Sequence, residues 1–145
     1  MKKIVLTSLL ALFLAFPVLP QDGPETVELP DAVMEQVVRQ IVGRYFKQRA
    51  TPKEINISAQ GIKAEWLPNV KNIKFVVVPD KKVALVSYMY AFEPVERKGK
   101  HYSVVFGLGN PTCDRNGDIW HFRVVKGRVH LIRRFGVMII RCDND

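Results

Sequence analysis

The pattern of hydrophobic and polar positions predicts one helix followed by a succession of strands. After Asp31, apolar residues recur at three- and four-residue spacing, at Val33, Met34, Val37, Val38, Ile41, Val42, Tyr45 and Phe46. This spacing is typical of an amphipathic helix of about 18 residues, for which Asp31 is the expected N-cap and Pro52 the stop signal. Further along, the alternation at residues 55–58 suggests a short strand, and from residue 73 onward apolar runs separated by turn residues predict a succession of strands at 73–78, 83–92, 101–108, 119–125, 128–135 and 137–142.

This order of elements predicts an α+β domain. One N-terminal helix would pack its apolar stripe on a curled antiparallel sheet of about five or six strands. The order resembles that of cystatin-like and NTF2-like folds, a likeness at the level of fold that no motif residues carry. Since one fold hosts many functions, the likeness implies an architecture and no activity.

The first twenty residues differ in character from the rest of the chain. Two lysines precede residues 4–19, which are uncharged and almost wholly apolar. This stretch is shorter than the about 20 residues of a membrane span and has the layout of a secretory signal. We expect residues 1–20 to export the protein to the periplasm or the exterior. An uncleaved anchor is the alternative, because the prolines near residue 20 make a poor cleavage site. Residues 21–30 are predicted to be a polar linker, and residues 31–145 a single domain.

The charge of the chain favours an anionic partner. Its formal net charge is +8, of which the two lysines of the export segment contribute two. A basic domain attracts an acidic protein or another anionic component of the cell envelope. The alternative is that the charge simply maintains solubility. Nucleic acid is disfavoured as a partner, since no basic run is interleaved with aromatic residues and export separates the protein from it.

The two cysteines agree with export. Cys113 and Cys142 are the chain's only cysteines. In an oxidising compartment such a pair is predicted to form a disulfide. Closing this loop stabilises the fold by about 3–4 kcal/mol in the chain-entropy model.

The dipeptide Lys126-Gly127 predicts a hairpin with a two-residue turn. In that register Val125 pairs with Arg128, and Arg123 pairs with His130. The predicted core face carries Trp120, Phe122, Val124, Val129, Leu131 and Phe135. The predicted outer face carries His121, Arg123, Arg128, His130 and Arg134.

This outer face is the main candidate binding site. Like charges that neighbour one another on a sheet are destabilising, so a cationic cluster is relieved by an anion or an acidic partner. The alternative is a solvated surface whose charges are paired with local acids. The prediction depends on the hairpin register, because a slip of one residue would scatter the cluster.

Two groups of residues have some of the features of a metal site. His121 and His130 would be diagonal neighbours, which can begin a transition-metal site, but the adjacent arginines repel a cation. A weak calcium candidate is the run Asp114, Asn116 and Asp118. Its glycine stands fourth rather than sixth, and its twelfth position is Val125 rather than glutamate, so a polar turn is favoured over a calcium loop.

Catalytic and cofactor motifs are not evident. No serine lies in a G-x-S-x-G elbow, and no glycine-rich loop has dinucleotide-binding spacing. We therefore predict no catalytic residues and no cofactor, and favour an extracytoplasmic binding or interaction module over an enzyme. One alternative is an accessory subunit of a membrane-associated complex. Another is a small cone-shaped ligand carrier or enzyme, with aromatic residues lining a cavity.

Overall fold

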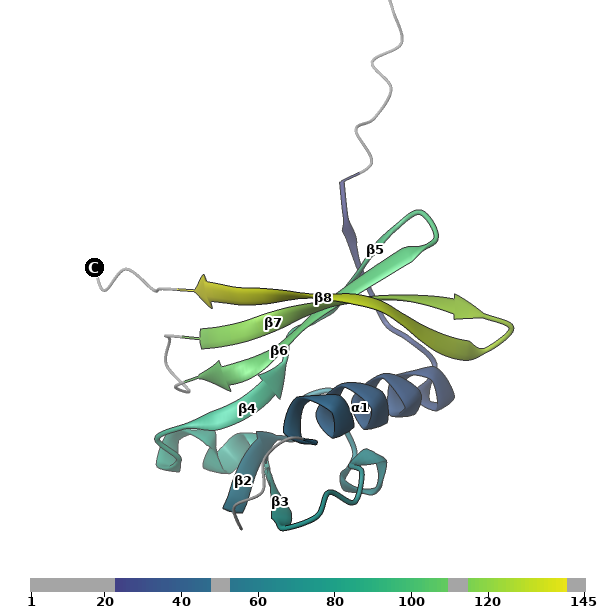
Figure 1. The fold of residues 1–145 in the computed structure, drawn as a ribbon. Coiled ribbons are helices and arrows are strands. Elements are labelled where there is room, and N and C mark those ends of the chain that lie inside the picture. The colour runs from purple at the N-terminus through teal and green to yellow at the C-terminus, as the bar shows by residue number, and fades with distance from the viewer. Residues whose placement is uncertain (1–22, 48–52, 110–114, 141–145) are drawn as a thin grey trace, which may run out of the picture.

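The computed structural model describes residues 23–47, 53–109 and 115–140. They form an α+β fold in which one α-helix lies on a strongly curled sheet, which confirms the predicted class (Figure 1). In chain order the elements are β1 (Glu25–Val27), α1 (Asp31–Phe46), β2 (Lys53–Ser58), the 3-10 helix η1 (Ala64–Trp66), β3 (Ile73–Val78), the 3-10 helix η2 (Asp80–Leu85), β4 (Met89–Phe92), β5 (Val95–Lys98), β6 (His101–Gly109), β7 (Arg115–Val125) and β8 (Arg128–Ile140).

Strand β6 is central to the sheet because it has neighbours along both edges. β7 lies along one edge of β6, and β8 lies outside β7. The other edge is shared, since β5 pairs with the part of β6 that starts at His101 and β4 with the part that ends at Gly109. β4 leads on to β2 and β3, whereas β5 leads to β1. The sheet therefore divides beside β6 into two arms.

The prediction of a wholly antiparallel sheet is wrong, because the sheet is mixed. β2 runs parallel to β3 along its whole length, from Lys53 opposite Ile73 to Ser58 opposite Val78, and it also runs parallel to β4. Parallel neighbours need a crossover connection of about a dozen residues or more. Residues 59–72, which include η1, supply this connection.

The predicted strand 83–92 is wrong over its first half. Residues 80–85 form η2, where the N–H groups of Lys82 and Val86 bond to carbonyls three residues earlier. These local bonds satisfy the backbone without a neighbouring strand. The apolar side chains there are not covered, since Leu85 is 82% exposed. Only Met89–Phe92 joins the sheet, as β4.

Helix α1 supplies one layer of the core. The side chains of Val37, Val38, Ile41, Val42 and Phe46 on its apolar stripe are fully buried. The helix begins after Pro30, which occupies the N-cap position predicted for Asp31, and the Asp31 carboxylate instead forms an ion pair with Lys63.

Aromatic rings fill the space between α1 and the sheet. The ring centroid of Phe46 lies 5.0 Å from that of Tyr90 and 6.3 Å from that of Phe106. Phe92 packs on Phe106 at 4.5 Å. These four rings are buried. Truncating a buried Phe in such a cluster typically costs about 3–5 kcal/mol.

Residues 25–27, expected in a polar linker, form strand β1. They pair with β5, and the Glu25 carboxylate forms an ion pair with Arg97 across the two strands. No helix in the described part of the chain is long and apolar enough to cross a membrane. Residues 4–19, the predicted export segment, lie outside the described residues, as do Cys113 and Cys142.

Candidate functional site

The hairpin of β7 and β8 has the predicted register near its turn. Val125 pairs with Arg128, Arg123 with His130 and, further along, Phe122 with Leu131. Lys126 and Gly127 form the turn with φ of 50° and 72°. Positive φ at both positions is the mark of a type I′ turn, whose twist matches that of the flanking strands.

A β-bulge then corrects the predicted faces. The register shifts between His121 and Phe122, so His121 lies opposite Arg133 and Ile132 is the extra residue. Because side chains alternate with a period of two, one extra residue exchanges the faces of the residues that follow it. Arg134, predicted on the outer face, and Phe135, predicted in the core, have therefore exchanged faces.

The contacts of these side chains agree with the exchange. Arg134 pairs with Asp118 at 3.2 Å, and its guanidinium carbon lies 5.7 Å from the ring centroid of the buried Trp120. Phe135 is 42% exposed, and its ring meets that of His121 edge-on at 5.1 Å. Arg133 thus takes the place on the outer face that was predicted for Arg134.

A row of basic side chains crosses four strands on this outer face. Lys98 of β5 lies opposite His101 of β6, and Arg123 of β7 lies opposite His130 of β8. The two halves of the row meet where Arg123 Nη2 lies 3.3 Å from His101 Nε2. With neighbouring strands about 4.8 Å apart, the row extends over about 14 Å. We call these four residues the basic row.

The next row of the same face adds further charge. Register places Glu96, Ser103, His121 and Arg133 side by side across β5, β6, β7 and β8. Arg128, two residues before His130 on β8, extends the cluster toward the turn. All three histidines of the chain therefore lie together on this face. The basic face, as we use the term, comprises Lys98, His101, His121, Arg123, Arg128, His130 and Arg133.

Among the described residues, none of these basic side chains forms an ion pair, although Glu96 lies on the same face. Within residues 23–47, 53–109 and 115–140, no carboxylate lies within ion-pair distance of any member of the basic face. All of them except the half-buried His121 are exposed. The arrangement departs from ordinary cross-strand pairing, in which directly opposed like charges are destabilising.

The fold alters the titration of His121. Its pKa lies below the ordinary value of 6.5, chiefly because partial burial disfavours the charged imidazolium. The positive charges of Arg133 and His101 lower the pKa further. In the protein without a bound partner, His121 is therefore neutral near pH 7. A carboxylate placed beside His121 would favour its protonation.

Four of the five residues predicted for this site are brought together, namely His121, Arg123, Arg128 and His130. The prediction missed Lys98 and His101, because the charged segment 93–100 was expected to be a connection rather than to contain β5. A local signal was present. Gly99-Lys100 forms a two-residue turn with φ of 61° at Gly99. Glycine at the first position of such a turn is a hairpin signal.

The weak calcium candidate does not form the expected polar turn. Asn116 and Asp118 lie within strand β7, and Asp114 lies outside the described residues. The buried carboxylate of Asp118 pairs with Arg134. Among the described residues, no group of three or more His, Cys, Asp or Glu side chains could hold a metal ion.

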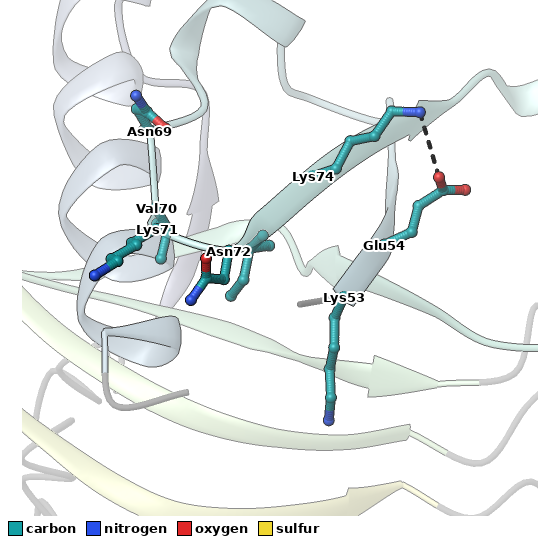
Figure 2. A pocket seen from close by; sticks show the side chains of 8 residues that line it. Lys53, Glu54, Asn69, Val70, Lys71, Asn72 and Lys74 are labelled. Carbon is teal, nitrogen blue, oxygen red and sulfur yellow. Dashed lines mark hydrogen bonds and ion pairs between the residues drawn. The ribbon is translucent and has the colours of Figure 1, made fainter. Parts of the chain in front are cut away.

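An open depression of about 550 Å³ lies between β2 and the segment that leads into β3. Figure 2 shows that the side chains of Lys53, Lys71 and Lys74 on its wall point away from one another. Lys74 also pairs with Glu54 at 3.3 Å. Since these ammonium groups do not converge, the depression is a weaker candidate than the basic face.

Comparison with known proteins gives no relative. No family model, no curated protein and no solved structure matches the chain. The class that can be stated is therefore structural: an α+β domain that exposes a basic face on one side of a curled sheet.

Proposed function

We propose that this protein is an extracytoplasmic binding module whose basic face holds an acidic segment of a partner protein. The proposal rests on the basic row. Lys98, His101, Arg123 and His130 lie side by side there, and none of them forms an ion pair with a carboxylate of the described residues. The extracytoplasmic location rests on the sequence of residues 1–20. The cystatin-like or NTF2-like assignment stays a prediction on which this proposal does not depend.

The energetics of the row favour an anionic occupant. Like charges opposed on neighbouring strands cost stability, and carboxylates placed between them convert that cost into charge-assisted hydrogen bonds. Arginine is suited to this role, because its planar fork binds a carboxylate through two N–H groups. Arg123 lies at the middle of the row and Arg133 and Arg128 on either side of it, so several carboxylates can be held at once.

The shape of the site favours a protein over a small ligand. The cationic groups spread across four strands instead of converging on one point, which suits a partner that presents several carboxylates at intervals. The carrier alternative receives less support, because the contacting rings of Phe46, Tyr90, Phe92 and Phe106 fill the region between α1 and the sheet.

Binding to poly-L-glutamate tests the proposal. The double variant Arg123→Glu/Arg128→Glu is expected to bind at least about tenfold more weakly than the parent protein, since two charge-assisted contacts are lost and two repulsions gained. The control Lys81→Glu/Lys82→Glu makes the same change in net charge on η2 and should bind like the parent. Equal losses in both double variants, with folding intact by circular dichroism, would reduce the effect to net charge and refute the proposed site.

A further inference from the structure

Strand β8 lies at an edge of the sheet that the described residues form. β8 pairs with β7 on one side, and no strand in the described ranges pairs with its other side. The strand runs from Arg128 to Ile140, which is long for an edge strand. Such an edge presents N–H and C=O groups to which another extended chain can bond.

Helix α1 covers this edge only beside the turn. Gln36 Oε1 accepts a hydrogen bond from the Val129 N–H at 3.1 Å, and Gln40 Nε2 donates to the Val129 carbonyl at 3.1 Å. Gln36 Nε2 also donates to the Gly127 carbonyl at 2.8 Å. The two glutamine side chains thus make the bonds that a neighbouring strand would make at this position.

At Leu131, no side chain of the described residues makes bonds like those of the two glutamines. In an antiparallel pair, alternate residues direct their N–H and C=O groups away from the partner strand, so those of Leu131 point outward as those of Val129 do. No bond to these outward groups of Leu131 is found among the described residues. The open edge therefore starts where the glutamines end, beside the basic face.

The charge of β8 selects what can pair with it. The strand contains Arg128, His130, Arg133 and Arg134, and no carboxylate. A second copy of β8 would double this positive charge, and like charges on neighbouring strands repel. An acidic segment is attracted on the outer face of the strand, where Arg133 lies, whereas Arg134 on the side of Trp120 is already paired with Asp118.

We propose that the edge of β8 from Leu131 onward receives an extended acidic segment of the partner protein as an added strand. This inference rests on the proposed function and specifies how the partner binds. Backbone hydrogen bonds to the edge hold the segment in register, and its alternate side chains lie beside the basic face. Recognition then needs a partner segment that is extended as well as acidic.

N-methylated peptides separate strand addition from attraction by charge alone. The probe is a short peptide in which glutamate and threonine alternate. One derivative is N-methylated on every glutamate and the other on every threonine. Only alternate N–H groups of an added strand face β8, so one derivative is expected to lose about tenfold or more in affinity while the other binds like the unmodified peptide.

Three outcomes overturn the inference. If both derivatives bind like the unmodified peptide, attraction by charge alone explains binding, and the proposed function survives without the added strand. If poly-L-glutamate binds but the short peptide does not, the edge is likewise not the site. If the protein forms a dimer in sedimentation equilibrium that the peptide does not dissociate, a second copy occupies the edge. If the parent protein bound neither the short peptide nor poly-L-glutamate, the proposed function itself would be refuted.

Discussion

The guanidinium Nη2 of Arg123 lies 3.3 Å from the imidazole Nε2 of His101, so two basic side chains from adjacent strands are in direct contact. Arg123 can donate a hydrogen bond only while Nε2 of His101 is unprotonated, since an imidazolium has no acceptor. On its other side Arg123 faces His130. The contact between Arg123 and His101 is therefore attractive only with a neutral imidazole.

Removing charge from the row should stabilise the free protein. We expect Arg123→Thr to raise the free energy of unfolding by about 0.2–1 kcal/mol at pH 5 and low ionic strength, because a like-charge cross-strand pair is removed and threonine suits a strand. Urea denaturation measures this change. The matched control Lys81→Thr, on η2, should change stability by less. A clear loss of stability in Arg123→Thr would mean that the row is a structural element and not a site kept for binding.

The titration of His121 gives a prediction with a definite sign. Its pKa is lowered by burial, by Arg133 and by His101, and Phe135 packs on its ring. Between the lowered pKa and about 6.5, the unfolded chain binds a proton at His121 that the folded chain does not. The contribution of His121 to stability is therefore complete above this window and declines as the pH falls through it.

NMR titration of the ring protons of His121 tests both parts of this account. The midpoint should lie below 6.5 in the free protein and move upward when poly-L-glutamate is bound, because carboxylates favour the imidazolium. By linkage, poly-L-glutamate should bind more tightly as the pH falls from 7 toward 5. The acids on the polymer must remain ionised for this test, which sets the lower limit of the pH range. A midpoint that does not move on binding would place the carboxylates away from His121.

Replacement of Gly107 by alanine should lower the stability of the protein, whereas replacement of Gly43 by alanine should raise it. A Cβ added at Gly107 in β6 would lie 2.0 Å from the carbonyl oxygen of Asn116 in β7, a backbone atom that cannot move aside cheaply. Gly107→Ala is therefore expected to destabilise the protein by about 1–3 kcal/mol or more. A Cβ at Gly43 in α1 meets only Pro68 Cγ, at 3.9 Å. Gly43→Ala should stabilise by about 0.5–1 kcal/mol, and thermal unfolding distinguishes the two.

The disulfide predicted between Cys113 and Cys142 joins two residues that lie outside the described part of the chain, so it stays a prediction from the sequence.

Mass spectrometry of the protein from its native compartment tests this prediction. It should show a mass two hydrogens lower than that of the reduced chain, and reduction should lower the unfolding midpoint by an amount that corresponds to about 3 kcal/mol. The double variant Cys113→Ser/Cys142→Ser should unfold at the midpoint of the reduced protein and not change on adding reductant. Two free thiols in protein taken directly from the cell would contradict both the disulfide and the inferred oxidising location.

Regular periodicity explains what could be predicted from the sequence. The stripe from Val33 to Phe46 predicted α1, and the Lys126-Gly127 turn predicted the pairing from Val125 to Phe122. Both depend on short-range rules. The faces could not be followed past the bulge, because no glycine or other local feature marks Ile132 as the extra residue. The parallel pairing of β2 and β3 is a long-range choice that alternation within a strand does not encode.

The sequence predicted only the part of the candidate site that lies on the β7–β8 hairpin. His121, Arg123, Arg128 and His130 were recognised because a single turn fixes their relative positions. Lys98 and His101 come from a second hairpin, and only the pairing of β6 with β7 brings the two hairpins together. Sequence spacing does not determine which hairpins become neighbours, so the length of the basic row could not be predicted.

The bulge at Ile132 affects the local shape of the sheet but not which charged residues lie opposite one another. If Ile132 were deleted, Arg133 would follow Leu131 directly and would still lie opposite His121, with Arg134 still opposite Trp120. Every cross-strand partnership would survive, while the local bend and the extra twist that a bulge introduces would be lost. In this fold the arginines and histidines determine the charge of the face, and the irregularities at Ile132 and between Gly117 and Ile119 bend the two strands that carry it.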